Sequence, residues 1–348
     1  MNTLTIRRPD DWHVHLRDGP ALASVLKFTA VRFGRAIVMP NLKPPVASTA
    51  LAASYRERII GALPAGSRFT PLMTLYLTDS TASSEIERAV RSGFVHGVKL
   101  YPAGATTHSD SGVTDIAKTY AALGRMEELG MPLLVHGEAA SPDVDVFDRE
   151  TVFIDTVLAP LLDRFAKLKV VFEHITSARA VQFVAGARAG VAATITPQHL
   201  LENRNAIFSG GIRPHFYCLP ILKRERDREA LVAAATGGSP RFFLGTDSAP
   251  HERSAKENAC GCAGMFSAHA AIELYAEVFE RAGCLDRLEP FASQFGAQFY
   301  GLPPAGGTIT LSKDPWLVPQ SYRFGGGTVI PYRAGESVGW RLSTAEPA

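Results

Sequence analysis

Eight short apolar or β-branched runs recur along the chain, separated by amphipathic or loop segments. The segments 84–91, 115–129 and 177–189 carry alanine, glutamate, arginine and leucine with helical periodicity. Alternating strands and helices predict a parallel sheet, and eight such units predict a closed (β/α)8 TIM barrel. An open doubly wound sheet is the alternative, but no glycine-rich dinucleotide motif follows the first run. The runs are residues 12–15, 36–39, 70–77, 95–100, 132–136, 170–173, 191–195 and 242–245.

The pattern changes after about Leu302, where glycine, proline and short β-prone runs such as 308–311 and 327–330 follow. We therefore expect a barrel domain over residues 1–302. Residues 303–348 are expected to form a small β appendage packed on the barrel, without a function of their own.

Composition narrows the class of partner. Lys and Arg number 36 against 34 Asp and Glu, so no basic field is available to attract nucleic acid or a membrane surface. A small-molecule substrate is expected instead. The chain has too few cysteines for a disulfide framework, and its amino terminus lacks an apolar signal core. Both observations predict a cytoplasmic protein with reduced thiols. The cysteines are Cys218, Cys260, Cys262 and Cys284, and their spacing lacks the Cys-x-x-Cys pairs of a structural zinc site.

Metal-binding residue types stand at the ends of several predicted strands. Residues two apart on a strand point the same way, so His13 and His15 would face one point, where a divalent cation is the usual partner. In a barrel, the carboxyl ends of the strands gather at one face. We therefore expect one cluster of side chains there, made of His13, His15, Lys99, His136, His174 and Asp247.

The number of candidate ligands indicates two metal ions. Four histidines and an aspartate exceed the three protein ligands of a typical catalytic zinc. Two cations in close proximity need a bridging anion, and the ammonium of Lys99 cannot be a ligand. Carbamylation by carbon dioxide would convert Lys99 into a carboxylate with one oxygen for each metal. The alternative is an ion pair between Lys99 and Asp247 across the barrel mouth.

Six motifs stand in order between about Arg8 and Leu302. They are DWHVHLRD (11–18), MPNLKPP (39–45), VKLYPAGATT (98–107), VHGE (135–138), FEHIT (172–176) and GTDSAPH (245–251). Together they resemble the motifs of the dihydroorotases, in the shorter monofunctional bacterial form of the amidohydrolase superfamily. One departure is Ser177, where a second threonine would be expected. The resemblance implies zinc-dependent, reversible interconversion of N-carbamoyl-L-aspartate and L-dihydroorotate in de novo pyrimidine biosynthesis.

The resemblance also assigns roles to the metal ligands. It implies a more buried zinc on His13, His15 and Asp247. A more exposed zinc would lie on His136 and His174, with carboxylated Lys99 bridging the two ions. Asp247 would in addition take a proton from the attacking water and pass it to the departing amide nitrogen, as general base and then general acid.

Substrate contacts are expected around the same cluster. The guanidinium of Arg17 can bind a carboxylate through two parallel hydrogen bonds, and the alternative for Arg17 is a rim salt bridge with Asp18. The loop 103–110 is small, polar and glycine-containing, as expected of a mobile lid that closes over the substrate. The resemblance implies that Arg17, Asn41 and His251 bind the carboxylate and that Leu219 and Ala263 bind the substrate through their backbones. Thr106 and Thr107 are expected to contact it from the lid.

Two other functions are weighed against this one. A hydantoinase or dihydropyrimidinase would share the metals but would not need Arg17, Asn41 and His251 together. A non-catalytic relative should have lost ligands, whereas every candidate ligand is present. His199, near the seventh strand end, could touch the site. We expect a homodimer, with no nucleic acid and no membrane as partner.

Overall fold

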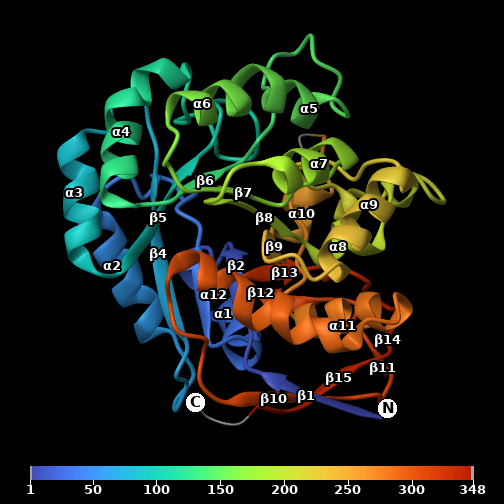
Figure 1. The fold of residues 1–348 in the computed structure, drawn as a ribbon. Coiled ribbons are helices and arrows are strands. Elements are labelled where there is room, and N and C mark those ends of the chain that lie inside the picture. Colours follow the sequence, from blue (N-terminus) through green and yellow to red (C-terminus); the bar gives the residue numbers. More distant parts are fainter. Residues whose placement is uncertain (1, 260, 346–348) are drawn as a thin grey trace.

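A barrel of parallel strands forms the centre of the protein, whose computed structural model describes residues 2–259 and 261–345 (Figure 1). Within these residues, eight strands pair in sequence order in one parallel sheet. The ring closes where Val14 pairs with Ser248, and the backbone N–H of Asp247 donates to the carbonyl of His13. The predicted TIM barrel is confirmed. The strands are β2 (Asp10–Val14), β3 (Arg35–Val38), β4 (Thr70–Tyr76), β5 (Val95–Leu100), β6 (Leu133–Val135), β7 (Val170–Phe172), β8 (Val191–Ile195) and β9 (Phe242–Leu244).

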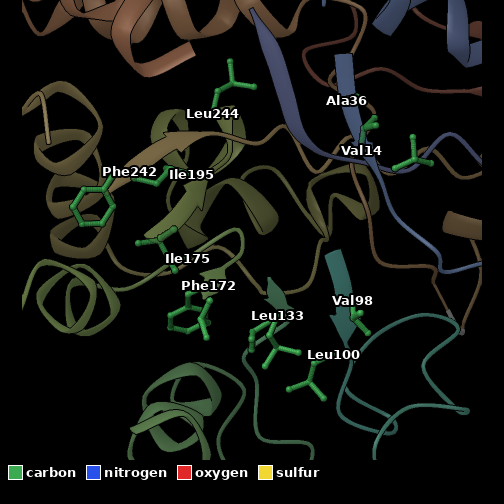
Figure 2. Packing of buried hydrophobic residues seen from close by; sticks show 14 of the residues in the cluster. Val14, Ala36, Val98, Leu100, Leu133, Phe172, Ile175, Ile195, Phe242 and Leu244 are labelled. Atoms are coloured by element: carbon green, nitrogen blue, oxygen red, sulfur yellow. The ribbon is translucent and has the colours of Figure 1, made fainter. Parts of the chain in front are cut away.

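Helices cover the outer face of the barrel (Figure 1). Alternate strand residues such as Val98, Leu100 and Leu133 point outward and are buried against these helices, as Figure 2 shows. The helices are α1 (Pro20–Arg32), α2 (Thr49–Gly61), α3 (Ser83–Ser92), α4 (Tyr120–Leu129), α5 (Arg149–Phe153), α6 (Ala159–Arg164), α7 (Ala178–Gly186), α8 (Pro197–Leu201), α9 (Glu225–Thr236), α10 (Arg253–Lys256), α11 (Ala271–Arg281) and α12 (Phe295–Tyr300). None of the described helices is both long and apolar enough to cross a membrane.

The departure at Ser177 has a structural role. Ser177 is the N-cap of α7, and its hydroxyl oxygen accepts a hydrogen bond from the backbone N–H of Ala180 at 3.1 Å. The same hydroxyl donates to the buried carboxylate of Glu150 at 2.5 Å. Serine therefore supplies the hydroxyl that the cap requires, and the helix begins where the sequence predicts.

One end of the barrel is filled with apolar side chains. Inward-facing Leu134, Val171 and Phe243 form a cluster with Trp12, and α12 packs beneath it. Gly296 of α12 lies so close to the Trp12 indole that a Cβ would come within 2.0 Å of its nitrogen. This end is closed, so the carboxyl ends of the strands form the only open mouth of the barrel in the described residues.

The β-prone tail forms small sheets, and one of them includes the beginning of the chain. Strand β1 (Thr3–Arg7) pairs antiparallel with β10 (Thr308–Ser312), which pairs in turn with β15 (Arg341–Ala345). The expected boundary after residue 302 remains a prediction, and this sheet joins residues from both sides of it. The other tail strands are β11 (Trp316–Leu317), β12 (Tyr322–Phe324), β13 (Gly327–Val329) and β14 (Ser337–Val338).

Candidate metal centre and substrate pocket

Three predicted ligands converge at the barrel mouth. The Nε2 atoms of His13 and His15 lie 3.4 Å apart, and each lies 3.3 Å from Oδ1 of Asp247. Two ligands bound at zinc distances of about 2.0–2.1 Å and at a tetrahedral angle are themselves about 3.3–3.4 Å apart. The triangle of donor atoms therefore has the dimensions of one face of a tetrahedral zinc site.

The backbone is strained at three residues of the mouth. Arg17, His174 and Asp247 have φ values of 60°, 43° and 45°, in the left-handed region that residues other than glycine rarely adopt. Such a conformation costs about 1–3 kcal/mol and persists only where the surrounding structure enforces it. His174 is the second residue after β7 and Asp247 the third after β9, and both side chains line the pocket.

Lys99 is completely buried behind the triangle and is ion-paired with Glu173. The alternative pairing with Asp247, weighed from the sequence, is not the contact that the structure has. Oε2 of Glu173 also lies 3.0 Å from Nδ1 of His13, on the ring edge opposite the triangle. Sequence reasoning missed Glu173. Because Glu173 comes two residues after the inward-facing Val171, the alternation of side chains along a strand places its carboxylate inside the barrel.

The ligands predicted for a second metal are close together but less fully assembled. The rings of His136 and His174 have centroids 4.9 Å apart, and His174 lies at the same distance from His13. Nε2 of His136 is 2.9 Å from a carboxylate oxygen of Glu138, a second buried acid that sequence reasoning did not single out. Donor atoms of His13, Glu173 and His174 lie within 4.8 Å of one another. The structure thus brings both histidines to the site, with His136 engaged by Glu138.

Burial sets the protonation states of two histidines in the cluster. It lowers the pKa of His15 to about 4 and that of His174 well below its usual value, so both rings are neutral at pH 7. Burial alone would raise the pKa of Asp247, but hydrogen bonds from His13 and His15 hold it well below the usual range. Neutral imidazoles and an ionised carboxylate are the forms that bind metal. Burial also lowers the pKa of Lys99, although the charge of Glu173 opposes this shift. The lowered pKa favours the uncharged amine, which is the form that reacts with carbon dioxide.

A polar pocket opens directly above the triangle. It contains every residue predicted to bind substrate, and it adds Tyr101, Ala249 and Gly264, which sequence reasoning missed. His13 and Lys99 lie beneath it, fully buried. The pocket is lined by His15, Arg17, Asn41, Tyr101, Thr106, Thr107, His136, His174, Leu219, Asp247, Ala249, His251, Ala263 and Gly264.

Arg17 is held in place without an acidic hydrogen-bond partner in the described part of the chain. Its Nε donates to the carbonyl of Pro250 at 2.7 Å, and its terminal nitrogen lies 3.0 Å from Nε2 of His251. Burial and the charge of Arg17 lower the pKa of His251, so the ring is neutral and can accept this hydrogen bond. Asp18, the alternative partner considered from the sequence, is instead paired with Arg58 at 2.8 Å. The guanidinium is therefore available to an anionic ligand.

The loop with Thr106 and Thr107 covers the pocket. The amide nitrogen of Asn41 donates to the Thr107 carbonyl at 2.9 Å, and the backbone N–H of Ala263 donates to the Thr107 hydroxyl at 3.2 Å. The remaining cavity has a volume of about 20 Å³, which leaves room for about one water molecule, since such a cavity needs about 10–15 Å³ to hold one. The pocket must therefore open before a ring-sized substrate can enter.

A buried lysine joins the two loops that carry Leu219 and Ala263. Nζ of Lys256 donates to the backbone carbonyls of Tyr217, Cys262 and Gly264 at 3.0, 2.8 and 2.6 Å. Three carbonyl acceptors satisfy all three donors of the ammonium group. The backbone edges predicted to bind substrate are thus fixed relative to each other.

His199 lies beside the site without entering it. Its Nδ1 is 2.7 Å from the hydroxyl of Thr196, and its Nε2 is 3.0 Å from the carbonyl of Pro220. Both ring nitrogens are occupied, so His199 positions the neighbouring chain and offers no free ligand atom. Cys218, Cys262 and Cys284 are free thiols, while Cys260 lies outside the described residues.

A family model describing the amidohydrolase family matches residues 10–327. The chain therefore belongs to the amidohydrolase family. This assignment agrees with the barrel, with the ligand cluster at the carboxyl ends of its strands, and with the resemblance found in the sequence.

Relatives with known names narrow the class further. A dihydroorotase of Methylobacillus flagellatus is 66% identical over 340 residues, which cover 98% of this chain and 99% of that protein. The crystal structure of a dihydroorotase from Campylobacter jejuni is 35% identical, with a TM-score of 0.90 over 99% of this chain and 98% of that one. The crystal structure of a dihydroorotase from Saccharomyces cerevisiae in complex with 5-fluoroorotic acid is 31% identical in sequence. Its TM-score is 0.91 over the whole of both chains. The activity of this chain is that of a dihydroorotase, an amidohydrolase acting on a cyclic amide.

Proposed function

We propose that the cluster holds two zinc ions and catalyses the interconversion of L-dihydroorotate and N-carbamoyl-L-aspartate in pyrimidine biosynthesis. The observation that carries this proposal is the triangle of His13, His15 and Asp247, whose edges of 3.3–3.4 Å match a tetrahedral zinc. His136, His174 and a carboxylated Lys99 would complete the centre. When bound, the ions supply a Lewis acid for the amide carbonyl and a water molecule of lowered pKa.

Asp247 is suited to move the proton in this reaction. Its carboxylate is ionised and lines the pocket, so it can accept a proton from the attacking water and donate it to the departing amide nitrogen. In the direction of ring closure, the same carboxylate removes the proton from the ureido nitrogen. The strained backbone of Asp247 fixes this carboxylate at the mouth, in contact with His13 and His15.

The other end of the pocket is suited to the substrate carboxylate. Arg17 has no acidic partner among its described contacts, and it forms a unit with His251 and with the adjacent Asn41. A guanidinium binds a carboxylate through charge-assisted hydrogen bonds, which favours dihydroorotate over ring amides that lack this group. The backbones of Leu219 and Ala263 would hold the pyrimidine edge, with Thr106 and Thr107 closing over it.

Metal analysis coupled to an activity assay tests this proposal. We expect about two zinc ions per chain, turnover of dihydroorotate, and little turnover of hydantoin or dihydrouracil, which lack the carboxylate. Full activity with one metal ion or none would overturn the binuclear centre. Preference for hydantoin or dihydrouracil would instead favour a hydantoinase or dihydropyrimidinase. We further propose that the enzyme is a cytoplasmic homodimer, which sedimentation and fractionation would test.

A further inference from the structure

Two stacked tyrosines at the barrel mouth have hydroxyl groups without hydrogen-bond partners. Tyr76 ends β4 and Tyr101 follows β5, and their rings lie with centroids 5.1 Å apart and planes inclined by 28°. Tyr76 is 0% exposed and Tyr101 is 2% exposed. Neither hydroxyl has a partner within the described residues. Because buried phenol groups normally find a partner, each of these needs an explanation.

The two tyrosines differ in what they face. Tyr101 lines the substrate pocket, whereas Tyr76 lies behind it and is not part of the lining. Tyr101 comes two residues after Lys99, so the alternation of side chains along β5 places both on the same side. The Nζ of Lys99 lies 5.0 Å from the centre of the Tyr101 ring. On its other side, the ring centroid is 6.0 Å from that of His136. Tyr101 is thus located next to the predicted metal ligands, at the reacting end of the pocket.

The Tyr101 hydroxyl can act as a hydrogen-bond donor, because an ordinary phenol has a pKa of about 10 and carries its proton at neutral pH. The ring is held between its neighbours, since it stacks on Tyr76 and lies next to the ring of His136 and the Nζ of Lys99.

We propose that the Tyr101 hydroxyl donates a hydrogen bond to the oxygen of the amide carbonyl under attack. This inference rests on the proposed function, because that carbonyl must lie beside the metal ligands. The carbonyl oxygen gains negative charge as water adds, so a preorganised donor in a dry site stabilises that charge. The unpaired hydroxyl then finds its partner only when substrate is bound.

The test compares Tyr101→Phe with Tyr76→Phe, a matched control that also removes one buried, unpaired hydroxyl from the same stacked pair. For Tyr101→Phe we expect kcat/KM for dihydroorotate to fall about tenfold. The dissociation constant of 5-fluoroorotic acid should rise about threefold or more, since that ligand retains the ring carbonyl. Tyr76→Phe should change neither quantity, and zinc content and Tm should match the wild type in both variants.

Unchanged kinetics and affinity in Tyr101→Phe would overturn the proposal. Equal losses in both variants would also overturn it, because they would indicate a packing role for the pair. If wild-type protein did not turn over dihydroorotate, the proposed function itself would fail. The affinity of the two variants for 5-fluoroorotic acid would still decide whether Tyr101 contacts the ligand.

Discussion

Single residues at the barrel mouth carry an unusual density of buried charge. Three carboxylates, those of Glu138, Glu173 and Asp247, are buried in the cluster with only one ammonium, that of Lys99. Burying unpaired charge costs several kcal/mol per ion, so such a cluster is stable only with compensating cations or protons. Burial lowers the pKa of His15 and His174 beside them, so these two rings supply ligand atoms but no positive charge. The excess of carboxylates is therefore a physical reason for the site to bind metal ions.

The role of Lys99 can be tested by removing its side chain. We expect Lys99→Ala to lower turnover at least about a hundredfold, because two adjacent cations lose the carboxylate that separates their charges. Short carboxylic acids such as acetate should restore part of the activity by occupying the space left by the side chain. The exposed Lys27 provides a control, since Lys27→Ala should behave as wild type. Wild-type turnover of Lys99→Ala without added acid would contradict the bridging role.

At the level of elements, local pattern was enough to place the barrel strands and to predict which candidate ligand side chains gather at the mouth. Each barrel strand is a short buried run, and predicted and observed bounds agree within about two residues, as for β5. His136 and Asp247 could be predicted because strand ends converge by symmetry. The partner of Lys99 could not be predicted in this way. Whether Lys99 pairs with Glu173 or with Asp247 depends on side-chain distances in the folded barrel, and no local sequence pattern encodes these distances. The pairing of β1 with β10 was missed for the same reason, since it joins segments about 300 residues apart.

The loop 103–110 is the element that we expect to move when substrate binds. We expect Thr106→Val with Thr107→Val to cut turnover about tenfold, because the hydroxyls that close over the substrate are lost while the shape is kept. Zinc content and Tm should stay unchanged, since the loop lies outside the apolar core. Ser111→Ala is a suitable control, because Ser111 is exposed on the same segment and does not line the pocket. Wild-type turnover of the double variant would indicate that the loop is only a connector and not a lid.

For the whole molecule, the predicted metal ligands join the two neighbouring strands at which the barrel closes. His13 lies on β2 and Asp247 follows β9, and Val14 pairs with Ser248 at this seam. Ligand binding to the native state alone adds stability, about 4 kcal/mol for a site at a thousandfold excess over Kd. Metal ions would therefore hold the barrel closed at its seam.

Removal of the metal ions should accordingly lower the stability of the whole barrel. We expect prolonged dialysis against a chelator to reduce Tm by about 5 °C or more, and added zinc to restore it. Calorimetry with parallel zinc analysis measures both effects. The variant Asp247→Asn, which weakens the triangle, should show a smaller difference between metal-loaded and metal-free protein. An identical Tm with and without metal would mean that the seam closes without help from the ions.

The sheet formed by β1 and β10 has a consequence for synthesis on the ribosome. Thr3 pairs with Ser312 and Arg7 with Thr308, so β1 waits for a partner made about 300 residues later. At elongation rates of about 5–20 residues per second, that wait lasts about 15–60 s. During this time Ile6, buried in the finished protein, is exposed on an unpaired strand edge. Nascent chains are therefore most open to aggregation, and to capture by chaperones, until β10 has left the exit tunnel.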